Sequence, residues 1–424
     1  EQYYGATTKS GEHRTSRAPT EPEWMLQKMG GDETAPIISI VNAILDEAIK
    51  NRASDIHIEP QEKVLRIRFR VDGVLRDIPA PPKSMQNAIT SRVKVMSNLD
   101  ISETRLPQDG RFERLLNGQR RVDVRVSTFP TIYGENVVLR LLDHGDVLRK
   151  LEELGLSPEN QKVLDSIIRL PHGILLVTGP TGSGKTTTLY SILQILNKPE
   201  VHIVTVEDPV EYQLPGIRQC QVNSKIGLTF SSGLRSILRQ DPDIILVGEI
   251  RDKETAEIAI HSALTGHLVL STLHTNDAAS APTRLIDMGV EPFLIASSLV
   301  GVLAQRLVRL LCLECREKYQ IASEQLESIG FPKETGRSID NITLYRGKGC
   351  RSCQMSGYTG RSGIFELMTV SDAIREHILK KSPSHTLKNI TQEKGMPTLR
   401  EDGFRKVVRW ETSLEEVLRA TELD

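Results

Sequence analysis

The spacing of apolar residues divides this chain into segments of different secondary structure. Residues 1–33 are polar and show no period, which is typical of a linker. From Ala35 to Ala48 the apolar residues recur at helical spacing. Over 65–71 they alternate with arginines instead, and Asp72-Gly73 supplies the turn of a hairpin. The chain therefore opens, after the linker, with a helix and a strand pair.

A second hairpin follows a helix predicted over 88–99. Asn117-Gly118 is its turn, and valines alternate with charged residues over 121–126. These elements predict a small α+β domain at 34–145 with arginine-studded strands.

From residue 173 the pattern changes to short apolar runs separated by helical segments. A mostly helical stretch, 148–169, leads into the first of four runs of strand length: 173–178, 202–206, 244–247 and 267–272. Such alternation predicts a mostly parallel sheet covered by helices. We expect an α/β core at 146–305, a cysteine-rich insert at 306–365 and a helical segment at 366–424.

The loop after the first of these runs carries a phosphate-binding motif. Its eight residues fit G-x-x-x-x-G-K-[ST]: Gly179, Pro180, Thr181, Gly182, Ser183, Gly184, Lys185 and Thr186. The glycines let backbone N–H groups converge on phosphate oxygens, Lys185 neutralises the β and γ charges, and Thr186 offers a hydroxyl to Mg²⁺. From Thr187 the chain continues as a helix whose N-terminus faces the phosphates. A glycine-rich turn that binds nothing is the weaker alternative, and the motif predicts nucleoside triphosphate binding.

Two carboxylates follow later strands of the same sheet. Glu249 comes after the apolar run 244–247, where a Walker B element carries its acid, and is a candidate for holding the Mg²⁺ shell or polarising water. Glu207 ends the run 202–206 and is a candidate general base, because ligands bind at the carboxyl ends of parallel strands. A solvated loop carboxylate and a turn before Pro209 are the respective alternatives.

His267 and His274 bracket the last of the four runs. Their spacing of seven does not place them on one face as metal ligands. A γ-phosphate sensor and histidines satisfied by backbone groups are both open interpretations.

Two C-x-x-C pairs lie in an otherwise thiol-poor chain. The four ligands are Cys312, Cys315, Cys350 and Cys353, and the pairs are separated by residues 316–349. This pattern predicts a closed, structural Cys₄ zinc site, with redox pairing as the alternative. The spacer is longer than in the usual zinc ribbon and must carry its own structure. Cys220 stands alone and is expected to be a partly buried thiol.

Four arginines occur where a hydrolase would need positive charge: Arg111, Arg125, Arg235 and Arg239. For each one alone, a solvated strand or helix face is the simpler interpretation. Opposed to the P-loop of an adjacent subunit, they would neutralise transition-state charge as arginine fingers.

Composition narrows the class of partner. The formal net charge of the 424 residues is −1 and aromatic residues make up 4%, which argues against bulk nucleic-acid binding. The longest apolar stretch, Phe293–Ala304, is too short to span a bilayer. No signal peptide opens the chain, which starts at Glu1. We expect a soluble cytoplasmic protein, a fragment without its natural N-terminus.

In their order, these motifs resemble the secretion ATPase superfamily that powers type II secretion and type IV pilus assembly. The resemblance covers nearly the whole chain from Asp32, through the P-loop, an acidic box at 205–209, the Walker B element at 244–249 and a histidine box at 264–276. Segments 106–111 and 122–125 look like the arginine-bearing strands of the superfamily's PAS-like N-terminal domain. Segments 91–96, 126–128 and 301–309 are more similar to the type II secretion branch.

The resemblance implies a RecA-like P-loop ATPase core behind that smaller domain, working as a hexameric ring. Hydrolysis would rotate one domain against the other and drive (pseudo)pilus assembly through an inner-membrane platform protein. Glu249 and Glu207 would share water activation and metal ordering, the two histidines would couple the γ-phosphate to domain motion, and the four arginines would complete the site. The chain would act in the cytoplasm at the inner membrane.

One departure concerns membrane recruitment. We expect the further N-terminal domain that docks such ATPases on a membrane-anchored recruiter to be missing, with residues 1–33 as its remnant and linker. A type IV pilus extension ATPase is one alternative function. A RecA-like nucleic-acid motor and a nucleotide-gated scaffold with little turnover are the others.

Overall fold

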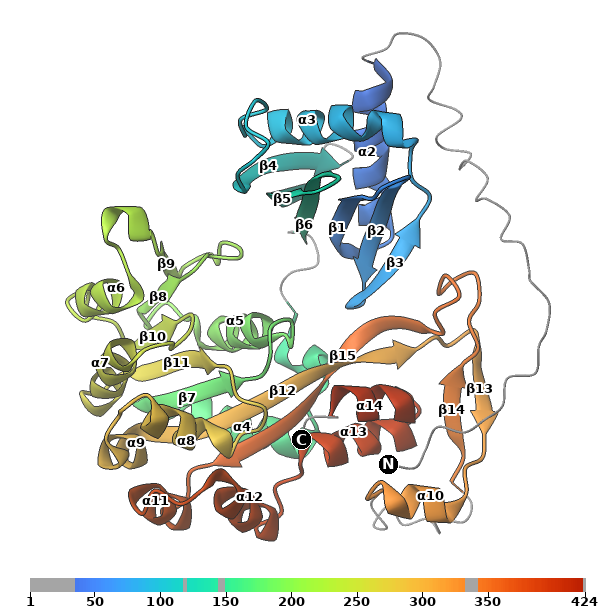
Figure 1. The fold of residues 1–424 in the computed structure, drawn as a ribbon. Coiled ribbons are helices and arrows are strands. Elements are labelled where there is room, and N and C mark those ends of the chain that lie inside the picture. The colour runs from blue at the N-terminus through green and yellow to red at the C-terminus, as the bar shows by residue number, and fades with distance from the viewer. Residues whose placement is uncertain (1–34, 117–119, 144–148, 332–341, 422–424) are drawn as a thin grey trace. The chain divides into compact units, whose positions relative to one another are not determined.

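The computed structural model describes residues 35–116, 120–143, 149–331 and 342–421 (Figure 1). The chain divides into two compact units, residues 1–143 and 144–424, close to the boundary predicted at residue 145. The predicted linker 1–33 and the Asn117-Gly118 turn lie outside the described residues.

The first unit is a six-stranded antiparallel sheet with helices on one face. The strands run in the order β3-β2-β1-β6-β5-β4. Their bounds are β1 Ala53–Pro60, β2 Leu65–Val71, β3 Val74–Ile78, β4 Gln108–Leu116, β5 Arg120–Thr131 and β6 Gly134–Asp143, with helices α2 at Ala35–Lys50 and α3 at Gln86–Met96 after a short 3₁₀ turn, η1 at Lys83–Met85. Apolar residues such as Ile67, Phe69 and Val124 pack beneath the helices, and the arginines that alternate with them lie on the other face. The predicted α+β unit is confirmed.

The second unit is built on a seven-stranded sheet in the order β15-β12-β7-β11-β10-β8-β9. Its strands are β7 Gly173–Thr178, β8 Ile203–Glu207, β9 Arg218–Gln221, β10 Ile244–Val247, β11 Leu268–Leu273, β12 Leu299–Leu311 and β15 Tyr358–Thr369. Every pairing is parallel except that of β12 with β15. The predicted mostly parallel sheet is confirmed.

Helices cover both faces of this sheet. Side chains of β7 alternate between two cores: Leu175 and Val177 pack with α5, whereas Ile174 and Leu176 pack with α7. The first core also holds η2 (Leu151–Leu154), α4 (Pro158–Ile168) and α5 (Lys185–Leu196), and the second holds α6 (Phe230–Ile237), α7 (Lys253–Leu264), α8 (Ser280–Asp287) and α9 (Pro292–Ser298). Burial on both faces explains why the strands are continuous apolar runs.

The strand β12 differs from the sequence prediction. The apolar stretch 293–304 splits into nearly all of α9 and the start of β12, and β12 runs on through residue 305, where the sequence suggested a boundary. It pairs with β7 and β15, and its side chains enter both cores, Val302 and Ala304 one and Leu303 the other, so no alternation of apolar and polar residues marks it. With β15 it forms a long ribbon from the central sheet to the hairpin of β13 (Arg316–Tyr319) and β14 (Leu344–Gly347), next to α10 (Ser323–Ser328) (Figure 1).

The predicted C-terminal helices are present as α11 Asp372–Leu379, α12 Ser384–Glu393, α13 Leu399–Val408 and α14 Leu414–Ala420. Their buried residues, among them Leu387, Phe404 and Val417, join the core that packs on β10 and β11. Across the described residues, no helix has both the length and the apolar character that a membrane span requires.

Candidate nucleotide site and metal centre

The P-loop joins β7 to α5 at the carboxyl edge of the sheet. Gly179, Gly182 and Gly184 have φ of 145°, 80° and 91°, a left-handed region that only glycine enters without strain. Ser183 N–H donates to the Pro180 carbonyl at 3.2 Å and closes the turn. The first-turn amides of α5, from Lys185 on, have no partner within the helix and are available to phosphate oxygens. The local structure is the cradle that the motif predicts.

Lys185 folds back over this cradle. Its ammonium donates to the carbonyls of Gly179 at 2.8 Å and Pro180 at 3.0 Å. Burial lowers the pKa of Lys185 to about 8, a shift that Glu249 opposes and Arg306 reinforces. The side chain is still mostly protonated at pH 7, and it lies where phosphate charge would replace its carbonyl partners.

Glu249 and His274 come to the same edge from β10 and β11. The Glu249 carboxylate lies 2.6 Å from Arg251 Nη2 and 3.6 Å from His274 Nε2. Burial and the charge of Lys185 lower the pKa of His274, so its imidazole is neutral near pH 7. The structure thus brings Lys185, Glu249 and His274 together from three strands, and it adds Arg251, which the sequence did not single out.

His267 lies at the opposite edge of the sheet. His267 directly precedes β11, whose first residue, Leu268, pairs with Gly173 at the start of β7. His274 directly follows β11, whose last residue pairs with Thr178 at the end of β7. The Nδ1 of His267 is 2.8 Å from the Ser262 carbonyl. The two histidines bracket the strand as predicted, but the fold brings only His274 to the P-loop, because strand ends point to opposite edges of a sheet.

Glu207 is buried at the end of β8. It accepts from Thr205 Oγ1 at 2.5 Å, from Gln219 Nε2 at 3.3 Å and from the hydroxyl of Tyr190 on α5. Burial raises the pKa of this carboxyl, and the three hydrogen bonds act against that rise. Glu207 is therefore engaged by neutral donors, whereas Glu249 is paired with the charged guanidinium of Arg251.

Arg235 and Arg239 lie on the exposed side of α6 and just beyond it. Arg235 pairs with Glu254 at 2.6 Å, and Arg239 donates to the Arg235 carbonyl at 2.9 Å. Their partners thus lie on α7 and α6, respectively.

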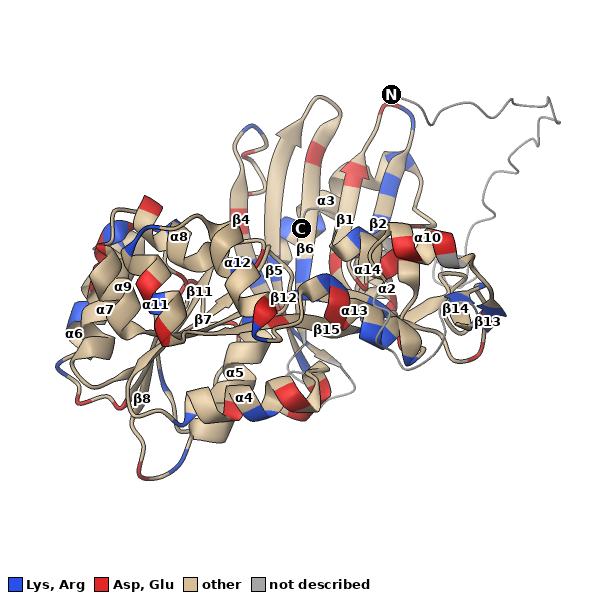
Figure 2. Cartoon of the chain, turned by 90° about the horizontal axis from the view of Figure 1, so that it is seen from below, with Lys and Arg blue, Asp and Glu red and all other residues tan. Residues whose placement is uncertain are grey.

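Arg111 and Arg125 are directly opposed on β4 and β5, and Arg125 is opposed in turn to Arg140 on β6. Arg140 Nε donates to Asp55 at 3.0 Å. Strand register therefore lines up three arginines across this sheet, and one of them, Arg140, is paired with Asp55. Arg140 could not be found from sequence, because only strand register places it there. Elsewhere acidic and basic residues are mixed across both units (Figure 2).

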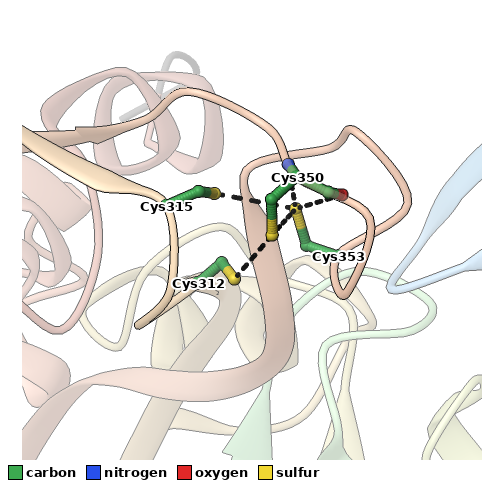
Figure 3. A group of neighbouring side chains, drawn as sticks. All are labelled: Cys312, Cys315, Cys350 and Cys353. Atoms are coloured by element: carbon green, nitrogen blue, oxygen red, sulfur yellow. Dashed lines mark hydrogen bonds between the residues drawn. The ribbon is translucent and has the colours of Figure 1, made fainter.

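The four predicted cysteines converge at the far end of β12 (Figure 3). Their sulfurs all lie within 4.8 Å of one another, with Cys312–Cys350, Cys315–Cys353 and Cys350–Cys353 at 3.8, 3.7 and 3.7 Å. Four sulfurs about 2.3 Å from a central zinc form a tetrahedron with edges of about 3.8 Å. The cluster therefore fits a tetrahedral metal ion.

Backbone amides support these sulfurs. The N–H groups of Gly349 and Gly357 donate to Cys315 and Cys353 at 3.3 and 3.2 Å. Such donors stabilise thiolates, the form that binds metal. The long spacer carries its own structure, as expected, in β13, α10 and β14. Cys220 is a half-buried free thiol.

Comparison with known proteins agrees with the resemblance to the secretion ATPases over nearly the whole chain. The model of the family "Type II/IV secretion system protein" matches residues 31–419. Type II secretion system protein E of Dickeya dadantii is 54% identical over 393 residues, which cover 93% of this chain and 77% of that protein. Type II secretion system ATPase E of Vibrio cholerae is 54% identical over 390 residues, covering 92% and 76%.

Solved structures agree with the fold. The pilus retraction motor PilT, crystallised with bound ADP, superposes with a TM-score of 0.59 at 27% identity and covers 90% of this chain and 96% of its own. The Legionella pneumophila ATPase DotB superposes with a TM-score of 0.65 at 22% identity, over 89% and 94%.

Proposed function

The chain belongs to the type II/IV secretion system protein family, and from that premise we propose that it is the ATP-hydrolysing motor of a type II secretion system. Its reaction is ATP + H₂O to ADP + phosphate, coupled to pseudopilus assembly and protein export. The relatives at 54% identity are named for type II secretion, which supports this branch over a type IV pilus extension ATPase.

The observation that carries the proposal is the meeting of Lys185, Glu249 and His274 around a formed P-loop. A cation for phosphate oxygens and a carboxylate that can orient the attacking water are groups that phosphoryl transfer to water uses, and His274 lies beside that carboxylate. All three lie beyond the carboxyl ends of the parallel strands β7, β10 and β11, which is where open α/β sheets bind ligands.

In the proposed reaction, water attacks the γ-phosphorus and the bond to the β,γ-bridging oxygen breaks, leaving ADP. Thr186 and Glu249 would hold Mg²⁺, which would supply positive charge against the triphosphate. Glu249 takes the proton of the attacking water, since its carboxylate faces Lys185 and His274, and His274 senses the γ-phosphate. Glu207, the second carboxylate, orders this edge through Tyr190 on the P-loop helix. His267 lies at the other edge and takes no direct part.

We propose a hexameric ring in which Arg111, Arg125, Arg235 and Arg239 reach the nucleotide of an adjacent subunit and domain rotation performs the work. The cysteine cluster holds Zn²⁺ as a structural ion. The motor acts in the cytoplasm at the inner membrane, on secretion platform proteins and a membrane-anchored recruiter, and not on nucleic acid.

The test is phosphate release by the assembled wild-type chain and by Glu249→Gln. We expect the variant to lose roughly a hundredfold or more in kcat while it still binds Mg-ATP. Equal, negligible rates in both would indicate a scaffold instead. Strong stimulation of the wild type by DNA, without stimulation by phospholipid or platform protein, would indicate a nucleic-acid motor.

A further inference from the structure

Gln305 on β12 lies against the P-loop although it is distant in sequence. Its side chain is buried, with 1% of its surface exposed. The carboxamide Nε2 donates to the Ser183 carbonyl at 2.7 Å, and its Oε1 accepts from Thr188 Oγ1 at 2.8 Å. One side chain therefore joins the P-loop backbone to the first turns of α5, with both ends of the amide satisfied.

Both the backbone and the side chain of Gln305 come close to glycines of the P-loop. A Cβ on Gly179 would lie 2.5 Å from the Gln305 carbonyl oxygen, and a Cβ on Gly184 would lie 3.1 Å from Gln305 Nε2. Two glycines of the motif thus permit the approach of this residue as well as that of phosphate. The P-loop is thus packed directly against Gln305 of β12.

The position of β12 is itself fixed beside the P-loop. Ala304 pairs with Thr178, the last residue of β7, so Gln305 comes level with Gly179. On the opposite face of the strand the buried Arg306 donates to the Asn276 carbonyl at 2.9 Å, in the loop that carries His274. Consecutive residues of one strand therefore hold the P-loop and the histidine loop.

We propose that Gln305 is a positioning residue for nucleotide binding: its carboxamide holds the Ser183 carbonyl so that the P-loop amides point into the phosphate cradle. It touches no substrate. Without this hydrogen bond the loop samples other conformations. The apparent affinity for nucleotide then equals the intrinsic affinity multiplied by the fraction of molecules in which the cradle is formed. This inference rests on the proposed nucleotide site.

The test is the affinity of the 424-residue chain for Mg-ADP, measured by calorimetry, together with KM and kcat for ATP. Gln305→Met keeps the volume and removes both hydrogen bonds. We expect Mg-ADP binding to weaken about tenfold to hundredfold, because a buried carbonyl and a hydroxyl lose their partner. KM should rise by a similar factor while kcat changes less than about threefold, since the contact orders the loop equally in ground and transition states.

Two conservative variants separate the ends of the amide. Gln305→Glu retains an acceptor for Thr188 but, when ionised, offers no donor to Ser183. Its affinity relative to wild type should therefore improve as the pH falls and the new carboxyl gains a proton. Thr188→Val removes only the other bond and should weaken binding by less than Gln305→Met does.

Val308→Ala is the matched control. Val308 lies on the same strand, is fully buried and packs in the core that holds α7, whereas the P-loop helix α5 packs in the other core. It should lower thermal stability and leave Mg-ADP affinity within about twofold. Equal affinity of Gln305→Met and wild type, or an equal loss in Val308→Ala, would overturn the proposal. If wild type itself binds no nucleotide, the proposed function fails instead.

Discussion

The P-loop and the cysteine cluster lie along one strand and are held in different ways. The P-loop contacts β12 at Gln305, and the cluster begins at Cys312, directly after the last residue of that strand. The P-loop is shaped by hydrogen bonds among protein groups, from Ser183 to Pro180 and from Gln305 to Ser183. The cluster instead places four sulfurs within 4.8 Å of one another, and thiolates at that distance repel unless a cation lies between them.

This difference follows from what each region has to do with its ligand. A nucleotide enters and leaves in every turnover, so its cradle must persist when empty, and a buried amide network provides that. A structural metal stays bound, and its binding free energy can be part of the folding free energy. The two regions should therefore respond oppositely to removal of their ligands.

Removing the metal should produce the largest effect. Structural zinc sites contribute roughly 10 kcal/mol or more of binding free energy. Strong chelation, or Cys350→Ser, should expose the amides of residues 312–319 and 344–357 to hydrogen exchange. Mg-ADP affinity should fall less than about threefold. A fully protected, metal-free cluster would show that the thiols need no ion.

The P-loop should depend on its glycines unequally. Gly179→Ala places a Cβ 2.5 Å from the Gln305 carbonyl at a φ of 145°, and we expect a loss of about 4 kcal/mol in unfolding free energy together with loss of Mg-ADP binding. Gly182→Ala is the matched control: its φ is 80° but nothing lies within 4 Å, so about 1 kcal/mol should be lost. Chemical denaturation of both variants measures the difference. Equal losses would mean that β12 does not confine the loop.

A buried carboxyl on β15 tests whether ionisation within the β12–β15 ribbon lowers the stability of the fold. Glu366 on β15 pairs with Ala304, and its oxygens accept from the amides of Ala278 at 2.8 Å and Leu399 at 3.3 Å. Burial raises the pKa of Glu366 to about 7, with Asp277 adding to the rise and Lys388 opposing it. The folded chain then binds a proton more tightly than the unfolded chain, so stability from this group is present at low pH and is lost as the pH rises through 7.

Glu366→Gln should remove that pH dependence. Between pH 5.5 and 8, the unfolding free energy of wild type should fall relative to that of Glu366→Gln by about 2 kcal/mol. Denaturant titrations of both proteins at each pH give the two unfolding free energies, and their difference removes the contribution of the other carboxyls. Parallel profiles would show that Glu366 titrates normally.

Cys220→Ser should have the smallest effect. Cys220 is half-buried on the edge strand β9, remote from the cluster in the strand order. A change within about 0.5 kcal/mol, with unchanged metal content and nucleotide affinity, is expected. Metal loss from this variant would remove it as a control for Cys350→Ser.

The sequence predicted local sites better than long elements. The P-loop strand, 173–178, and the strand 244–247 before Glu249 were predicted with the bounds that the structure has, because each is a short apolar run beside a motif. β12 was missed, since a strand buried on both faces has no alternation and adjoins a helix without a turn signal. The arginine row from β4 to β6 and the role of Gln305 depend on strand register, which the sequence does not contain.

By itself, the sequence determined the groups whose chemistry needs neighbouring residues. Phosphate is bound by consecutive backbone amides and a lysine, and each half of the metal site by two thiols three residues apart, so both are written locally in 179–186 and in the two C-x-x-C pairs. Only the tertiary structure decided that Glu249 and His274 meet Lys185 while His267 does not, and that Gln305 holds the loop. These groups come from separate strands, and their positions follow from which edge of the sheet each strand end reaches.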